Sequence, residues 1–119
     1  MSDYLTQMVQ DVVSIASDKK ALQSTVYKPY DTSFSDFIIL VVVQNAIQLK
    51  AISDDMDASL SRSIAVNGQG YHPKQSGVSQ SGWVVLDTGS MVVHVISEPV
   101  LEYFLLHDFF VKQAVVHHF

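Results

Sequence analysis

Apolar and polar residues alternate along residues 83–96 in the pattern of two β-strands joined by a tight turn. Residues 87–90 (D-T-G-S) suit that turn, because Asp and Ser side chains bond nearby backbone and glycine accepts a positive φ. Period-two alternation places Val84 and Leu86 on one face of the first strand and Trp83 on the other. Neither face of the second strand is fully polar. This β-hairpin is therefore expected at the centre of a sheet that is covered on both faces.

Two strands and two helices are expected before the hairpin. Residues 4–16 carry apolar side chains at three- and four-residue spacing, which predicts a helix that covers one sheet face. Residues 22–28 are β-prone, and residues 37–43 are seven consecutive apolar residues, which predict a buried central strand. Asn45 is expected to cap a second helix. The apolar stripe of that helix is formed by Leu49, Ile52, Met56 and Leu60.

The passage at residues 67–82 is rich in Ser, Gln and Gly and predicts a long loop. A short strand near residues 71–75 is confined to an edge by Pro73, which has no N–H to donate. Glu98-Pro99 begins the last helix, where proline costs no hydrogen bond. The apolar excess continues to Phe119, and a helix apolar nearly all round requires cover from a second copy or a partner. The predicted fold is α/β, a single compact domain with a mixed β-sheet flanked by helices.

The composition of the chain indicates which class of partner it binds. The chain has 119 residues, which fits one domain over residues 1–119. Apolar residues make up 48% and charged residues 16%, which suggests that apolar surface is kept for a partner. The net charge of −5 argues against sequence-specific nucleic-acid binding and favours a basic protein partner.

The sequence also bears on location. There is no cysteine, so the cytoplasm is the expected compartment. Residues 1–11 do not resemble a secretory signal. The apolar residues 100–116 are interrupted by charged residues and by His107, so no membrane association is expected.

No catalytic motif is present in the sequence. It has no G-x-S-x-G elbow and no phosphate-cradling loop, and its five histidines are scattered. His94 is interpreted as a packed histidine with one bonded nitrogen. Asp54, Asp55 and Asp57 are close in sequence, but they are interpreted as a solvated helix face rather than a cation site. No catalytic residue, metal or cofactor is predicted.

Three segments resemble the ribosomal silencing factor family, RsfS, also called Iojap. Residues 35–40 (S-D-F-I-I-L) resemble the family's T-D-x-hydrophobic strand. Residues 83–95 (W-V-V-L-D-T-G-S-M-V-V-H-V) are similar to its W-[IV]-[LV]-[IV]-D-x-G-D-[IV]-[IV]-V-H-[IV] motif, and residues 104–110 resemble its closing helix. The match covers residues 34–110, with residues 111–119 as an apolar C-terminal extension. The chain resembles a divergent member, because Ile47-Gln48 stands where the family usually has Arg-His.

The resemblance implies a nucleotidyltransferase-like topology and a mechanism without catalysis. Family members bind the fourteenth protein of the large ribosomal subunit and block joining of the small subunit, which represses translation. An acidic domain with exposed aromatic and aliphatic side chains suits such a basic protein. The predicted partner-binding residues are Trp83, Thr88, Phe104, Leu106 and Phe110. Asp87 and Gly89 are expected to serve the turn.

Two other functions remain open from the sequence. The fold of the family is similar to that of nucleotidyltransferases, which makes a phosphoryl-transfer enzyme the first alternative. Such enzymes hold Mg²⁺ with paired carboxylates on a strand, whereas Asp36 stands alone before Phe37. The second alternative is a homodimeric interaction module without ribosome binding. An organellar location is also compatible with the resemblance.

Overall fold

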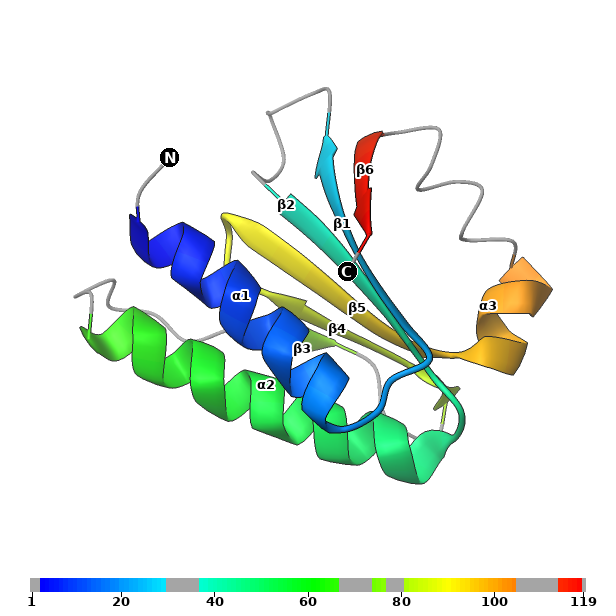
Figure 1. The fold of residues 1–119 in the computed structure, drawn as a ribbon. Helices are drawn as coiled ribbons and strands as arrows, with labels where there is room; N and C mark the ends of the chain where they lie inside the picture. Colours follow the sequence, from blue (N-terminus) through cyan, green and yellow to red (C-terminus); the bar gives the residue numbers. More distant parts are fainter. Residues whose placement is uncertain (1–2, 30–36, 67–73, 77–80, 105–113, 119) are drawn as a thin grey trace.

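The computed structural model describes residues 3–29, 37–66, 74–76, 81–104 and 114–118 (Figure 1). Its elements are, in chain order, α1 (Asp3–Asp18), β1 (Gln23–Pro29), β2 (Phe37–Val43), α2 (Ala46–Val66), β3 (Lys74–Ser76), β4 (Trp83–Asp87), β5 (Met91–Ser97), α3 (Glu98–Phe104) and β6 (Ala114–His118). The expected helices and strands before the hairpin, and the hairpin itself, are therefore confirmed.

The strands form one six-stranded sheet in the order β3-β4-β5-β2-β1-β6. β2 and β5 run parallel, with Phe37 opposite Met91 and Val43 opposite Ser97, and every other neighbouring pair is antiparallel. The sheet is therefore mixed, as predicted. Of the hairpin, β5 lies at the centre of the sheet, while β4 lies one strand from the β3 edge.

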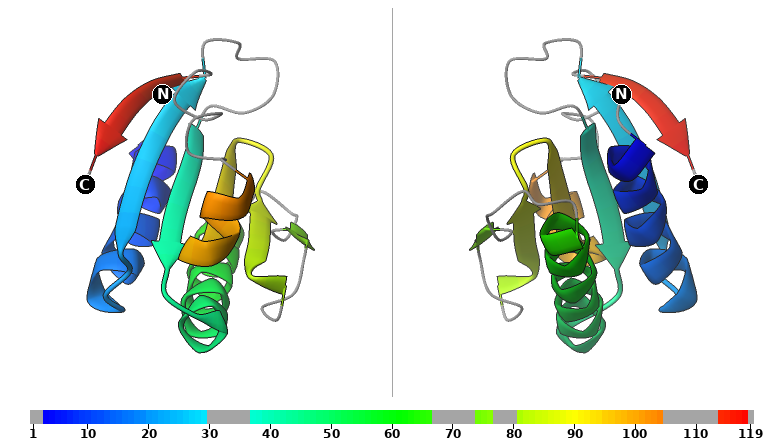
Figure 2. Two further views of the ribbon diagram at one scale, coloured as in Figure 1. Left: turned by 90° about the vertical axis from the view of Figure 1, so that its right-hand side faces the viewer. Right: turned by 90° about the vertical axis from the view of Figure 1, so that its left-hand side faces the viewer.

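The two faces of the sheet have different covers. In the left view of Figure 2, α1 and α2 lie behind the sheet and α3 is the helix in front of it. On the first face the two long helices bury an apolar stripe against the sheet, as the three- and four-residue spacing requires. This core includes Val12, Leu49, Met56, Val41, Leu86 and Val93, each completely buried. On the second face α3 covers a smaller core of Tyr27, Leu40, Val42, Ile96 and Leu101.

The C-terminal end of α1 is closed by backbone hydrogen bonds. Lys20 N–H donates to the carbonyl of Ser17 at 3.0 Å, and Ala21 N–H donates to the carbonyl of Ala16 at 2.9 Å. This pair of bonds is a Schellman motif, which requires a left-handed residue between the helix and the next strand. Lys20 fills that position with φ of 62°.

Asn45 caps α2 as predicted. Its side-chain oxygen accepts a hydrogen bond from Gln48 N–H at 2.9 Å. The side-chain amide nitrogen of Gln48, Nε2, in turn donates to the backbone carbonyls of Lys19 and Lys20, at 3.0 and 2.9 Å. Gln48 therefore ties the start of α2 to the end of α1.

The prediction of a continuous apolar helix to the end of the chain is wrong. α3 ends at Phe104, and residues 114–118 form β6, which pairs with β1 from Ala114 opposite Pro29 to His118 opposite Thr25. Consecutive β-branched residues at Val115 and Val116 favour an extended backbone, and the outer edge of β1 supplies the hydrogen-bond partners. His117 and His118 accordingly lie on a strand rather than on a helix or a frayed tail.

The expected edge strand in residues 67–82 is present at β3, a few residues later than predicted. Gly82, at the end of the same passage, has a φ of 82°. A Cβ on Gly82 would lie 2.6 Å from Val100 Cγ2 and 2.7 Å from Ser97 Oγ. The carbonyl of Gly82 also accepts the N–H of Ser97 at 2.8 Å. This glycine therefore lets α3 pack closely against the start of β4.

We expect Lys20→Gly to stabilise the protein by about 1 kcal/mol, because glycine adopts the left-handed conformation without the Cβ clash. Urea denaturation measures the change in the free energy of unfolding. Lys20→Ala removes the same charge but keeps the Cβ, and should give no such gain. Equal stabilisation by both variants would assign the effect to charge and contradict the prediction.

We expect Gly82→Ala to destabilise the protein by roughly 2–4 kcal/mol, the sum of a strained φ and overpacking against Val100 and Ser97. Gly89→Ala is the matched control, since Gly89 also has a positive φ, of 90°, but is exposed in the turn whereas Gly82 is buried. Its loss should be limited to about 1–2 kcal/mol. Thermal or urea unfolding of both variants compares the losses, and equal losses would show that the close packing of α3 is unimportant.

Candidate functional site

The second face of the sheet leaves part of the hairpin half-buried. Along β4, residues alternate between half-buried and buried from Trp83 to Asp87, and along β5 the residues at 92 and 94 are half-buried. The buried residues that alternate with them, Val84, Leu86, Met91, Val93 and Val95, face α1 and α2, so the half-buried ones share the opposite face. We call this set the β4–β5 surface; it consists of Trp83, Val85, Asp87, Val92 and His94.

Trp83 and His94 are joined by a hydrogen bond on this surface. The indole Nε1–H of Trp83 donates to Nδ1 of His94 at 3.1 Å. The ring centroids are 5.9 Å apart and the planes are inclined by 41°. Trp83 also packs against the core beneath α3. It thus packs partly against the core and partly belongs to the β4–β5 surface.

Burial lowers the pKa of His94 from 6.5 to about 4. The imidazole is therefore neutral at physiological pH, and because Nδ1 accepts the indole proton, its own proton lies on Nε2. The interpretation of His94 as a packed histidine with a bonded nitrogen is confirmed.

Thr88 has a structural role rather than the predicted contact role. Its side chain is 1% exposed. The hydroxyl accepts the N–H of Met91 at 3.1 Å and donates to the carbonyl of Met91 at 3.2 Å. Asp87 Oδ1 accepts Gly89 N–H at 2.8 Å, as expected for a turn residue. Thr88 closes the turn from inside, so we exclude it from the β4–β5 surface.

The remaining predicted contact residues come from the end of α3 and beyond. Phe104 is the last residue of α3, and Leu106 and Phe110 lie outside the described residues. Sequence reasoning missed Tyr103, which is 78% exposed on α3. Helical spacing could have indicated this exposure. Leu101 is the buried residue of the short helix, and a residue two positions later points to a different side, toward solvent.

The acidic residues of α2 lie on an exposed helix face, as predicted. Asp54 pairs with Lys50 at 2.9 Å and Asp55 pairs with Lys19 at 3.1 Å, all with side chains roughly half exposed. Within the described part of the chain, no three His, Cys, Asp or Glu side chains are grouped to hold a metal ion. The described helices also include none long and apolar enough to cross a membrane.

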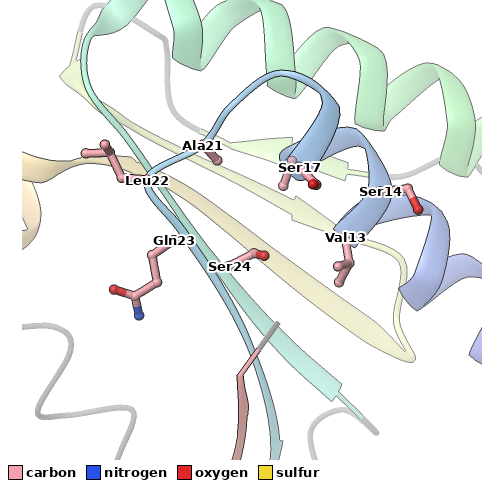
Figure 3. A pocket seen from close by; sticks show the side chains of 8 residues that line it. Val13, Ser14, Ser17, Ala21, Leu22, Gln23 and Ser24 are labelled. Carbon is pink, nitrogen blue, oxygen red and sulfur yellow. The ribbon is translucent and has the colours of Figure 1, made fainter.

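An open pocket of about 470 Å³ lies between the end of α1 and the start of β1. In Figure 3, Ser24 points toward α1 and Gln23 points away from it. The lining residues are small, apolar or uncharged polar, namely Val13, Ser14, Ala16, Ser17, Ala21, Leu22, Gln23 and Ser24. This lining offers no acid, base or charged ligand, so we assign no chemistry to the pocket.

The lowered pKa of His94 predicts a loss of stability in acid. Between pH 6.5 and about 4 the unfolded chain binds a proton that folded His94 does not, so the free energy of unfolding falls as pH drops through this window. We expect a loss of roughly 1–3 kcal/mol from this group. Urea denaturation at several pH values measures it. His94→Asn cannot titrate and should show a shallower dependence, and parallel curves for the two proteins would contradict the assignment.

Comparisons with known proteins place this fold among solved structures. Protein CV0518 from Chromobacterium violaceum superposes with a TM-score of 0.73 at 20% identity, covering 88% of this chain and 84% of that one. A protein from Bacillus halodurans superposes with a TM-score of 0.67 at 26% identity, covering 87% of this chain and 93% of that one. The likeness to the first protein shows the fold alone.

The sequence comparisons identify the family. An uncharacterized protein of Caenorhabditis elegans, K12H4.2, is 28% identical over 92 residues, which are 76% of this chain and 48% of the relative. The chain thus spans about half the length of this curated relative. The profile of the family described as "Ribosomal silencing factor during starvation" matches residues 2–118. The match extends on both sides of the motif-bearing residues 34–110, and the chain belongs to the RsfS family.

Proposed function

We propose that this chain is a ribosomal silencing factor that binds the large ribosomal subunit through its fourteenth protein. Bound there, it sterically blocks joining of the small subunit and represses translation. Membership of the RsfS family supports the silencing role. The observation that carries the binding proposal is the half-buried Trp83 on a sheet face over which, among the described helices, α3 alone lies.

The β4–β5 surface has the composition of a protein-binding site. It combines an aromatic residue with the branched apolar side chains of Val85 and Val92, and none of these is fully buried. Tyr103 adds an exposed aromatic ring on α3, which covers the same face of the sheet. Partly buried aromatic residues commonly supply most of the affinity at interfaces, because they lose water-exposed apolar area without much loss of conformational freedom.

The charge of the segment from β4 to α3 favours a basic partner, although Lys74 of β3 lies opposite Asp87. Residues 83–104, from β4 to α3, include the acidic residues Asp87, Glu98 and Glu102 but no lysine or arginine. Glu98 and Glu102 are exposed. Complementary charge speeds the encounter with a basic protein and orients it before the apolar contacts form. A ribosomal protein, which lies against RNA, is such a partner.

The proposed mechanism needs no chemical step by this chain. The family is described by a regulatory role rather than by a reaction. A domain bound at the face of the large subunit that meets the small subunit would occupy the space that joining requires. We place this action in the cytoplasm, where subunits exchange, or in an organelle with its own ribosomes.

Sucrose-gradient sedimentation of purified ribosomal subunits tests the proposal. The protein should co-migrate with the large subunit and reduce the amount of joined ribosomes. Trp83→Ala should weaken binding by roughly 30-fold, the size of a typical interface hot spot. Tyr103→Ala should weaken it less, since an exposed residue at the edge of an interface contributes less.

The control variant is Lys50→Ala on α2, behind the opposite face of the sheet, where a half-exposed ion pair contributes little to stability. It should bind like the parent. Thermal unfolding of each variant separates loss of contact from loss of folding. Absence of the folded parent from every large-subunit fraction would refute ribosome binding. Equal loss for Lys50→Ala and Trp83→Ala would refute the assigned surface.

A further inference from the structure

The hairpin register brings Trp83 and His94 together. Asp87 lies opposite Val92, so Val85 lies opposite His94 and Trp83 lies opposite Ile96. Trp83 and His94 are therefore diagonal neighbours on one face of the sheet, a distance that long and aromatic side chains can bridge. The hydrogen bond of 3.1 Å between their side chains follows from that geometry.

The hydrogen bond to His94 determines which atoms of Trp83 a partner protein can contact. An indole has a single polar hydrogen, Nε1–H, and no acceptor. That hydrogen is directed at His94 Nδ1. The rest of the indole is carbon, so a protein that contacts Trp83 from solvent meets an apolar ring rather than a hydrogen-bond donor. The bond also selects one orientation of a side chain that would otherwise adopt several rotamers.

We infer that His94 is a positioning residue of the partner-binding surface, which holds the indole of Trp83 in a single orientation and satisfies its N–H so that the partner contacts ring carbons. This inference rests on the proposed function. In this role His94 affects partner binding by orienting Trp83 and does not contact the partner itself. Preorganisation of this kind increases affinity, because the ordering of the side chain is completed before the partner arrives.

A purely structural role for His94 would predict different behaviour. The side chain is half-buried, with Val85 and Leu40 opposite it on the neighbouring strands. If it served only to fill space, an aromatic ring of similar size would replace it without effect on binding. His94→Phe keeps a ring and removes the acceptor. His94→Asn loses the ring but keeps an acceptor, because its Oδ1 occupies the position of Nδ1 along the side chain. The two variants separate volume from hydrogen bonding.

The test compares binding with the state of the indole. Trp83 is the chain's one tryptophan, so its indole N–H resonance and its fluorescence report this site alone. We expect His94→Phe to shift the N–H resonance upfield and to weaken binding to purified large subunits by about tenfold, equivalent to ~1.4 kcal/mol. We expect His94→Asn to restore the resonance and most of the affinity. Lys50→Ala serves as the control for both measurements.

Each outcome decides a different point. The positioning role would be overturned if His94→Phe bound like the parent. It would also be overturned if His94→Asn bound as weakly as His94→Phe. Either result would leave ribosome binding intact. Failure of the folded parent to bind would overturn the proposed function and this inference with it. If His94→Phe does not fold, His94→Gln replaces it, since its amide lies one bond further from the strand and should not restore the bond at 3.1 Å. Binding and resonance like those of the parent in that variant would then overturn the inference.

Discussion

The parallel pairing of β2 and β5 is the constraint on which the rest of the structure depends. All seven residues of β2 are paired with all seven of β5, and these are the two central strands of the sheet. Parallel neighbours cannot be joined by a tight turn, so the chain between them must cross over the sheet. α2 makes that crossing and brings its apolar stripe onto the face that it shares with α1. The chain then turns back from β4 into β5 through the three residues 88–90, which leaves the hairpin's other face toward α3.

Local pattern was enough to predict most of this arrangement. The spacing of Leu5, Met8 and Val12 placed α1, and the consecutive apolar residues of β2 placed the central strand. The turn at residues 87–90 followed from Asp87 and Gly89, both of which act as the sequence predicted. In these segments the residues that determine local conformation also face the core. One hydrophobic pattern therefore indicates both the type of element and the side that is buried.

The errors arise where neighbours distant in sequence decide the structure. β6 is stabilised by β1, about ninety residues earlier, and an apolar segment of that length fits a helix or a strand until its partner is known. Thr88 was predicted as a contact alongside the family resemblance, yet its hydroxyl turns inward to Met91. The bond between Trp83 and His94 could have been found in the sequence, because the turn fixes the hairpin register and the register makes these residues diagonal neighbours.

The edges of the sheet explain why binding should use its face. An exposed edge strand can pair with another chain, and short edge strands reduce that tendency. The two edge strands, β3 and β6, have three and five residues, the shortest along with β4 among those described. Strand addition at β3 or β6 would therefore gain few hydrogen bonds. The second sheet face offers an aromatic residue, branched apolar side chains and acidic neighbours, and of the described helices α3 lies over it. Burial of that face gains most from the hydrophobic effect, and the fixed orientation of Trp83 lowers the entropy that burial would cost.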